Sequence, residues 1–140
     1  MKVKEIMSRD VDVVSPETTL RDAAERMSAL DVGALPVCDK NRLVGMITDR
    51  DITVRATADG LDPFATQVGE VMSKDELVTC FENEEIEAAA QKMRDKQVRR
   101  LPVLNEERNL VGIVSLGDVA VDQSDVSVSS EVLKEVSRPS

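Results

Sequence analysis

Hydrophobic and polar positions along the first part of the chain predict a strand followed by a helix. Residues 11–14 are β-branched and partly alternating, a pattern that is typical of a strand. Ser15, Pro16 and Glu17 then predict a helix start, with Ser as N-cap, Pro at the first helical position and an acid in the first turn. Five residues recur at helical spacing and predict one apolar face: Leu20, Ala23, Ala24, Met27 and Leu30.

The next stretch predicts a hairpin and a second helix. Residues 31–34 end the first helix, and residues 35–38 are expected to form a strand. A polar turn at 39–42 leads into a second strand at 43–48, which we expect to pair with the strand before it. Asp49 is expected to start a helix that runs to about Ala58 and ends at Gly60.

The second part of the chain follows the same plan. A strand is expected at 76–79, two more at 98–104 and 110–115, and a short helix opening at Asp118. The apolar face of its long helix consists of Ile86, Ala89, Ala90 and Met93, in the spacing of Leu20, Ala23, Ala24 and Met27. After Ala120 the chain is rich in Ser and acidic residues, and a last short helical pattern has Val132, Leu133 and Val136 on one side.

These matching patterns belong to an internal repeat. Gly45–Ile52 and Gly112–Val119 both read Gly, two apolar residues, a hydroxyl residue, two variable residues, Asp and an aliphatic residue, at an offset of 67. Leu-Pro-Val precedes both copies, and Glu-x-Met-Ser lies further upstream in both. The repeat predicts two domains, 1–60 and 68–121, with a linker at 61–67 and a tail at 122–140. Because a half of about 60 residues buries little surface, we expect the two copies to pack on each other.

Composition narrows the possible functions. The 140-residue chain has a net charge of −9, and it lacks the basic surface on which general nucleic-acid binding depends. It has no His, which removes the commonest general base, so we expect no enzyme activity, no catalytic residues and no metal site. It also has no long apolar run and no signal-peptide pattern, so we expect no membrane partner and a cytoplasmic location.

The candidate chemistry lies in Thr48 with Asp51 and in Ser115 with Asp118. Each pair stands where a strand is expected to turn into a helix, whose first N–H groups carry partial positive charge. An ionised Asp accepts two hydroxyl hydrogen bonds and therefore suits a ribose, while the helix start suits a phosphate. The alternative is plain helix capping. Because the pair occurs twice, each time after Leu-Pro-Val, we favour nucleotide binding.

The chain resembles a tandem pair of cystathionine β-synthase (CBS) domains, a Bateman module of the stand-alone prokaryotic type. The resemblance rests on 32–37 with 45–52 and on 98–103 with 112–119, and it covers about residues 3–120. It implies an α+β (α/β) fold of two β-α-β-β-α units that pack sheet to sheet around a pseudo-two-fold axis. It also implies two clefts between the copies that bind adenosine compounds such as AMP, ADP, ATP or S-adenosylmethionine, with no obligatory cofactor.

The resemblance assigns residues of both copies to each cleft. In the first cleft, Thr48 and Asp51 are expected to face Met72 and the backbone of Val98, Arg99 and Arg100. In the second cleft, Ser115 and Asp118 are expected to face Met7 and the backbone of Val32, Gly33 and Ala34. The Asp would take the ribose hydroxyls, and the Thr or Ser would help to hold ribose or phosphate.

The positive groups best placed for phosphates are Arg50, Arg99 and Arg100, although Arg50 is equally well read as a solvated helix residue, and one of Arg99 and Arg100 is expected to make surface ion pairs. Arg99 and Arg100 are adjacent, so in a strand at most one of them faces a given cleft. Gly117 stands where the first copy has Arg50, so the second cleft is expected to hold phosphate less firmly.

Four methionine and cysteine residues have a packing role as the alternative to a role in a site. Met7 and Met72 are flexible apolar residues that more often belong to a core than to a ligand site, although they can serve both. Cys38 and Cys80 are expected to be small buried hydrophobes, and two thiols without a His make no convincing metal site.

The expected function is a regulatory module that senses adenosine nucleotides and acts through an unknown effector protein. The alternatives are an interaction or scaffold module with empty clefts, or a redox-responsive pair. We also expect a homodimer, because one small chain cannot cover four apolar helix faces. The candidate contact residues are Leu20, Met27, Ile52, Val54, Ala56, Ile86 and Met93, although most of them could be used inside the chain.

Overall fold

The computed structural model describes residues 1–75 and 77–122, and they form two compact units. We call residues 12–77 the Thr48 unit, and residues 1–11 together with the chain from Val78 onward the Ser115 unit. The units therefore do not coincide with the sequence repeats, because each unit contains the segment that opens the other repeat. Residue 76 of the expected strand and the tail from 123 onward, with its short helical pattern, lie outside the described residues.

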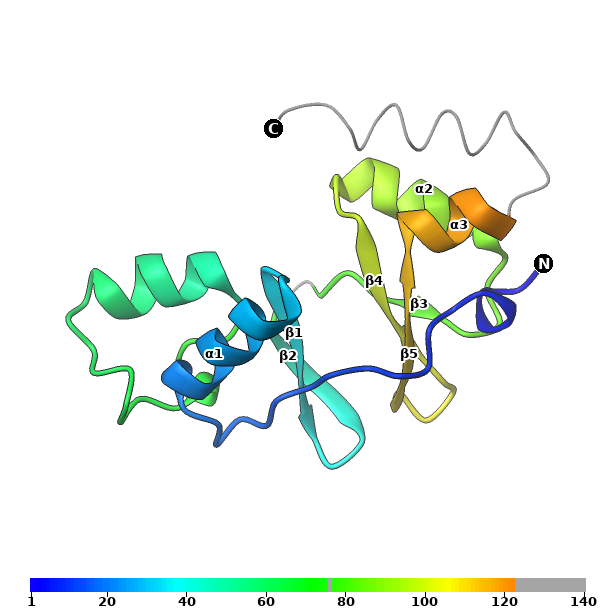
Figure 1. Cartoon of the computed structure of the whole chain (residues 1–140). Coiled ribbons are helices and arrows are strands. Elements are labelled where there is room, and N and C mark those ends of the chain that lie inside the picture. Colours follow the sequence, from blue (N-terminus) through cyan, green and yellow to red (C-terminus); the bar gives the residue numbers. More distant parts are fainter. Residues whose placement is uncertain (76, 123–140) are drawn as a thin grey trace. The chain divides into compact units, whose positions relative to one another are not determined.

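The Thr48 unit consists of a helix, a hairpin and a second helix (Figure 1). The helix α1 spans Leu20–Leu30, the strands β1 and β2 span Ala34–Asp39 and Arg42–Thr48, and the π-helix η2 spans Asp51–Thr57. A short 3-10 helix, η3, spans Val68–Glu70. The antiparallel pairing of β1 with β2 confirms the predicted hairpin, and it sets Ala34 opposite Thr48.

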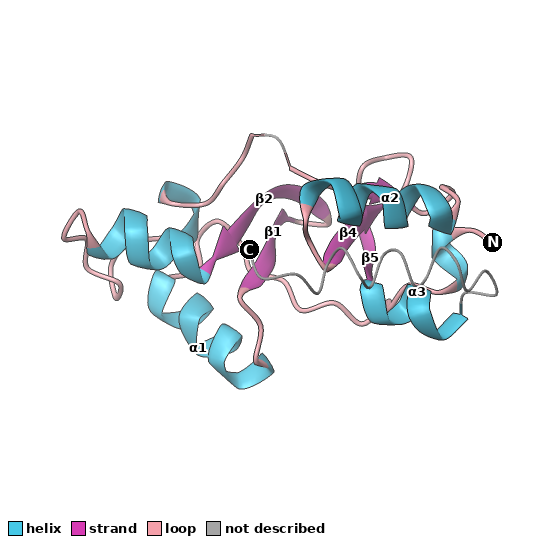
Figure 2. Cartoon of the chain, turned by 90° about the horizontal axis from the view of Figure 1, so that it is seen from above, coloured by secondary structure: helices cyan, strands magenta, loops and turns pink. Residues whose placement is uncertain are grey.

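The Ser115 unit has the full β-α-β-β-α order that the resemblance implies. Its elements are η1 (Val3–Glu5), β3 (Cys80–Phe81), α2 (Ile86–Lys96), β4 (Arg100–Leu104), β5 (Leu110–Ser115) and α3 (Leu116–Asp122). The strand β4 pairs in parallel with β3 and antiparallel with β5, which sets Arg100 opposite Ser115. The helix α2 contacts β4 and α3, and α3 contacts β5 (Figure 2).

The first strand of each repeat is shorter or later than the sequence predicts. Residues 11–14 form no strand, because Val14 alone bridges Val37, where its N–H donates to the Pro36 carbonyl. In the second repeat β3 starts at Cys80, after the predicted 76–79. Cys80 bridges Val103 in the same parallel sense in which Val14 bridges Val37, so the pairing itself is shared by the two units.

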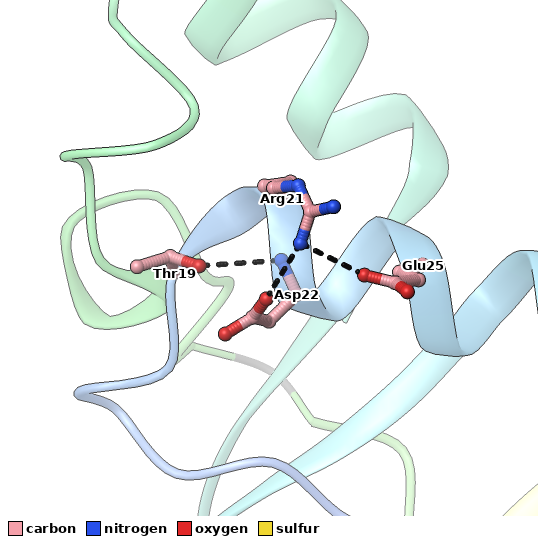
Figure 3. Close-up of polar contacts among 4 residues, drawn as sticks. All are labelled: Thr19, Arg21, Asp22 and Glu25. Carbon is pink, nitrogen blue, oxygen red and sulfur yellow. Dashed lines mark hydrogen bonds and ion pairs between the residues drawn. The ribbon is translucent and has the colours of Figure 1, made fainter.

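The start of α1 is four residues later than the predicted N-cap at Ser15. The N-cap is Thr19, whose Oγ1 accepts a hydrogen bond from the Asp22 N–H at 3.2 Å (Figure 3). Ser15 instead closes a turn with Thr18, and the Pro16 carbonyl accepts from the Gly69 N–H at 2.8 Å. Residues before Thr19 therefore pair with the segment around η3 and are not free to begin a helix.

The linker predicted at 61–67 packs against that helix start. Its carbonyls at Pro63 and Thr66 accept hydrogen bonds from the N–H groups of Arg21 and Leu20, both at 3.0 Å. The guanidinium of Arg21 also lies 5.6 Å from the centre of the Phe64 ring, and on its own helix it pairs with Asp22 and Glu25 (Figure 3). The first N–H groups of α1, which lack helical partners, are thus satisfied by the linker.

The helices after β2 and β5 begin slightly earlier than their Asp residues. The chain becomes helical at residue 49, as predicted, and continues as the π-helix η2, whereas α3 begins at Leu116 and not at Asp118.

The apolar face of α1 is narrower than predicted. Leu20, Ala23 and Met27 are buried, while Ala24 and Leu30 are exposed.

Each unit has a hydrophobic core of its own. In the Thr48 unit, α1 and the hairpin bury Leu20, Ala23, Met27, Leu35, Val37 and Ile47, together with Val68 and Val71 from the second repeat. In the Ser115 unit, α2 and the sheet bury Ile86, Ala89, Ala90, Met93, Leu101, Val103 and Val114, together with Val3, Ile6 and Met7 from the first repeat. The expected sheet-to-sheet packing concerns how the units meet, and it stays a prediction.

Candidate functional site

Thr48 and Asp51 form a reciprocal pair at the end of β2. The Thr48 N–H donates to Asp51 Oδ2 at 3.0 Å, and the Asp51 N–H donates to Thr48 Oγ1, also at 3.0 Å. This is the two-way arrangement of a capping box, in which each side chain satisfies the other residue's backbone donor. Thr48 and Asp51 therefore do cap the helix, as the alternative interpretation states. The capping hydrogen bond uses Oδ2 of the Asp51 carboxylate.

Ser115 and Asp118 form the same pair at the end of β5. The Ser115 N–H donates to Asp118 Oδ2 at 2.9 Å, and the Asp118 N–H donates to Ser115 Oγ at 3.1 Å. All four side chains are half-buried. Within the described residues Oδ1 of Asp51 and of Asp118 has no hydrogen-bond donor, so each carboxylate keeps an acceptor for a ligand hydroxyl.

The Gly that opens each motif lets the segment from the other repeat approach closely. A Cβ at Gly45 would lie 2.7 Å from Met72 Sδ and 2.8 Å from the Ser73 carbonyl oxygen. A Cβ at Gly112 would meet Met7 Sδ and the Ser8 carbonyl oxygen at the same two distances. Ser73 bridges Met46, and Ser8 bridges Ile113, each through two backbone hydrogen bonds. The glycines are therefore needed for packing, which sequence reasoning did not recognise.

Met72, from the second repeat, lies in the Thr48 unit, and Met7, from the first repeat, lies in the Ser115 unit. Met72 is half-buried against the core of the Thr48 unit, and Met7 belongs to the core of the Ser115 unit. Both therefore have the core role that was the alternative reading, beside the strands that carry the candidate pairs. Whether they also contact a ligand stays a prediction.

The segments expected to supply backbone contacts lie next to the candidate pair of their own repeat. The Asp49 N–H donates to the Gly33 carbonyl at 3.0 Å, and the Leu116 N–H donates to the Arg99 carbonyl at 2.8 Å. Residues 32–34 thus lie beside Thr48, and residues 98–100 lie beside Ser115. The cross-copy contacts predicted for these segments depend on the placement of the units and stay predictions.

The three candidate arginines are all exposed. Arg50 precedes Asp51, and its backbone N–H donates to Asp49 Oδ1 at 2.8 Å. The side chains of Arg50, Arg99 and Arg100 form no salt bridge with a described residue. Gly117, which stands in place of Arg50, leaves room for a Cβ at 3.6 Å from Ser115 Oγ.

Two further residues were missed by the sequence analysis. Asp49 lies beside Gly33, where a Cβ would come within 3.2 Å of its Oδ2. Arg55, on η2, donates from Nη1 to the Val71 carbonyl at 3.0 Å, so it connects this helix to the segment that carries Met72. The sequence signal for each was its charge alone, at a variable position of the motif for Asp49 and after the motif for Arg55, and it gave no contact partner.

Cys38 and Cys80 are free, buried thiols, as predicted. Burial raises the pKa of Cys38, and burial together with the Glu84 carboxylate raises the pKa of Cys80 to about 12. They belong to different units, Cys38 to the Thr48 unit and Cys80 to the Ser115 unit. Among the described residues no three His, Cys, Asp or Glu side chains are grouped as a metal site.

The model of the CBS domain matches the chain at residues 3–56 and again at 68–122. The chain belongs to the CBS domain family. The CBS domain-containing protein YhcV of Bacillus subtilis is 46% identical over 135 residues, which cover 96% of this chain and 94% of YhcV. Hypoxic response protein 1 of Mycobacterium tuberculosis is 43% identical over 118 residues, 84% of this chain and 81% of that protein. The family accounts for the repeated motif and for the mixed helix and sheet fold.

Solved structures of CBS domain pairs are also similar. Hypoxic Response Protein I with two coordinated zinc ions has a TM-score of 0.76 and 40% identity, covering 87% of this chain and 98% of that one. CBSX2 in complex with AMP has a TM-score of 0.73 and 28% identity, covering 90% and 98%. The domain pair of MJ0100 in complex with 5′-methylthioadenosine and S-adenosyl-L-methionine has a TM-score of 0.69 and 28% identity, covering 86% and 94%. Two of these similar pairs, CBSX2 and that of MJ0100, thus bind adenosine compounds.

Within residues 1–75 and 77–122, no helix has the length and apolar character that crossing a bilayer requires.

Proposed function

We propose that this CBS domain pair is a regulatory module, not an enzyme, and that it binds adenosine nucleotides or S-adenosylmethionine at its two Thr/Ser–Asp pairs. The observation that carries the proposal is the free Oδ1 of Asp51 and of Asp118, each held beside a hydroxyl residue by the capping hydrogen bonds. A carboxylate oxygen fixed in this way is an acceptor for ribose hydroxyls. Related pairs in complex with AMP and with S-adenosylmethionine support the same ligand class.

The adenine base of such a ligand has to be bound without aromatic side chains stacking on it. The chain has two Phe residues and no Trp or Tyr. Phe64 and Phe81, both exposed, are not part of the candidate pairs. We infer that aliphatic side chains and backbone hold the base, with Val32, Gly33 and Ala34 or Val98, Arg99 and Arg100 as the neighbouring segments. The small side chains of Gly33 and Ala34 allow a base to approach the main chain closely.

Calorimetry with AMP, ATP and S-adenosylmethionine tests the proposal on the parent chain and on Asp51→Asn and Asp118→Asn. The Asn carbonyl still accepts the capping hydrogen bond, but its NH₂ group replaces the free acceptor oxygen. Each variant should lose about ten- to a hundredfold in affinity at its own site, the range expected for a charge-assisted hydrogen bond. Absence of binding by the parent chain would refute the proposal and favour an interaction module.

We also propose that the module is a homodimer and signals to an effector protein in the cytoplasm. Leu20, Met27, Ala56, Ile86 and Met93 are buried inside the units, so they cannot form the contact. Val54 remains 52% exposed on η2 and Phe64 remains 69% exposed in the linker. Because the charge of −9 opposes association, dimerisation should strengthen with salt. Sedimentation showing one species near 15.3 kDa, with and without nucleotide, would exclude the dimer.

A further inference from the structure

We propose that the two sites select ligands of different charge: the Ser115 site takes adenosine polyphosphates, and the Thr48 site takes adenosine compounds with little negative charge or with a positive charge. The inference rests on the proposed function, because it assigns a ligand class to each of the two proposed sites. It rests on the strand register and on the charged residues that the register brings to each Thr/Ser–Asp pair.

The register decides which arginine shares a face with the candidate hydroxyl. Arg100 is the cross-strand partner of Ser115, and directly paired residues of an antiparallel ladder project from the same face. Arg99 precedes the strand, and its carbonyl accepts the Leu116 N–H. Arg100 is therefore the guanidinium that emerges beside Ser115, and it is exposed and has no carboxylate partner among the described residues.

The equivalent position in the Thr48 unit has no charge. Ala34 is the cross-strand partner of Thr48, in the place that Arg100 has opposite Ser115. Gly33 stands in the place of Arg99, as the shared hydrogen bonds to Asp49 and to Leu116 show. The strand side of the Thr48 site thus offers a phosphate no cation from its own unit.

The helix starts that follow β2 and β5 also differ in charge. Asp49, whose carboxylate lies next to Gly33, is an exposed acid, whereas its counterpart Leu116 is a buried apolar residue. The Thr48 site therefore combines Asp49 and Asp51 with Arg50, and the Ser115 site combines Asp118 with Arg100. Gly117 in place of Arg50 favours the opposite order because it removes one cation, but Arg100 adds one cation and Leu116 removes one acid.

These charges lie close enough to matter for a bound nucleotide. A nucleotide whose ribose is held by the Asp carries its 5′-phosphates within about one Debye length, roughly 10 Å, of the neighbouring side chains. Each phosphate is therefore held more favourably at the Ser115 site than at the Thr48 site, and the difference between the sites grows from AMP to ATP. A sulfonium such as that of S-adenosylmethionine has the opposite sign, and Asp49 favours it.

The test isolates each site and compares ligands that differ only in charge. Asp118→Asn weakens the Ser115 site, so that binding at the Thr48 site is measured. Asp51→Asn weakens the Thr48 site, so that binding at the Ser115 site is measured. In each background, calorimetry measures adenosine, AMP, ADP and ATP at about 0.05 M and about 0.5 M salt. We expect the ratio of ATP affinity to adenosine affinity to be roughly tenfold or more higher at the Ser115 site, and we expect the gap to narrow at the higher salt.

Exchange variants then assign the effect to residues. Asp49→Asn should raise the ATP-to-adenosine ratio at the Thr48 site severalfold, and Arg100→Ala should lower it at the Ser115 site by a similar factor. Asp39→Asn and Arg42→Ala are the matched controls, because they change the same charges at the turn end of the β1–β2 hairpin. The ratios should respond to the site variants and not to these controls.

The outcomes separate the inference from the proposed function. Equal ATP-to-adenosine ratios at the two sites, with both sites binding adenosine, would overturn the inference and leave the proposed function intact. A response of the ratios to the control variants as large as to Asp49→Asn would overturn it too, since net charge would then explain the selectivity. Absence of binding by any of the four ligands to the parent chain would overturn both.

Discussion

The Thr48 unit and the Ser115 unit share the contacts that hold the fold but differ in the side chains around their candidate sites. In both, the chain after the long helix follows the same path, and the residue that ends α1 or α2 has a left-handed backbone, at Asp31 and at Gln97. In both, a basic side chain of the long helix holds the chain before it: Arg26 donates to the Val13 carbonyl and Lys92 to the Thr79 carbonyl. These contacts recur because both copies must pack the same backbone.

The differences lie at the strand ends and at the helix starts that follow them. Asp49 is replaced by Leu116 and Ala34 by Arg100, and η2 is a π-helix where α3 is α-helical. π-helical turns are uncommon and are found frequently at functional sites. The comparison indicates that packing keeps Gly45 and Gly112 and the two Thr/Ser–Asp caps alike in the two copies, while the exposed residues Ala34 and Asp49 differ from their counterparts.

The largest expected contrast is in thiol reactivity, where the two cysteines occupy unlike positions. Cys80 has a pKa raised from 9.0 to about 12, so at pH 8 its thiolate fraction is about a thousandfold lower than that of an unburied thiol. Only the thiolate attacks a disulfide reagent, and the chain should therefore react at Cys38 before Cys80. Timed labelling of Cys38→Ser and Cys80→Ser, followed by mass spectrometry, measures each thiol separately. Faster native-state labelling of Cys80 would contradict the burial seen here.

A raised thiol pKa also has a consequence for stability at alkaline pH. Because the folded pKa of Cys80 is above its unfolded value, its contribution is fully present below about pH 9 and is lost as pH rises towards 12. Replacement of Cys80 by Ser should reduce the alkaline decline in the free energy of unfolding, which denaturant titrations at several pH values measure. An identical decline in both proteins would show that other groups cause it.

The second contrast tests the close approach that the two units share. Gly45→Val and Gly112→Val should each lower the free energy of unfolding by about 2–4 kcal/mol, because the new side chain collides with Met72 and Ser73 or with Met7 and Ser8. Urea unfolding monitored by circular dichroism measures the loss.

Gly117→Ala is the control for this pair, since its Cβ meets only Ser115 Oγ, at 3.6 Å. It should change the free energy of unfolding by less than about 1 kcal/mol. If Gly45→Val and Gly112→Val lowered the free energy of unfolding as little as the control, the close packing of the segments that carry Met72 and Met7 would be wrong.

A smaller effect is expected from the capping hydroxyls. Thr48→Ala and Ser115→Ala each remove the acceptor of the Asp51 or Asp118 N–H, and each should cost about 1 kcal/mol. Thr48→Ser keeps the acceptor and is the matched control. Thermal unfolding compares the three variants with the parent chain. A much larger loss in one unit than in the other would break the equivalence of the two pairs.

The smallest expected effect is the difference in stability loss between variants of Lys92 and of Arg26, the basic residues of the two long helices. Lys92 has a second partner, Glu84, whose carboxylate lies 2.9 Å from Nζ, whereas the side chain of Arg26 bonds, among the residues the structure describes, to the Val13 carbonyl alone. Lys92→Ala should therefore cost about 1 kcal/mol and Arg26→Ala about half as much, since both side chains are partly exposed. Salt should reduce the difference, because it screens the ion pair. Equal losses that do not depend on salt would assign the effect to the carbonyl contacts.

Much of the fold followed from local patterns. The strands at 35–38 and 43–48, the apolar face of the long helix with Ile86, Ala89, Ala90 and Met93, and the Thr/Ser–Asp pairs were predicted from alternation, helical spacing and the repeated motif. The start of α1 was not, because Ser15 and Pro16 satisfy every local criterion for a helix start, yet the segment around Gly69 pairs with them. The strand at 11–14 failed for a similar reason, since only Val14 finds a partner strand.

The sequence alone determined the repeat, the family and the residues that form each candidate pair. These are properties of spacing and residue type, which the order of the chain contains directly. The tertiary structure decided that the segment opening each repeat packs on the other repeat, and that Gly45 and Gly112 allow this approach. It also decided that Arg100 and not Arg99 pairs with Ser115. These contacts join residues that are far apart in the chain, and no local preference specifies which of them meet.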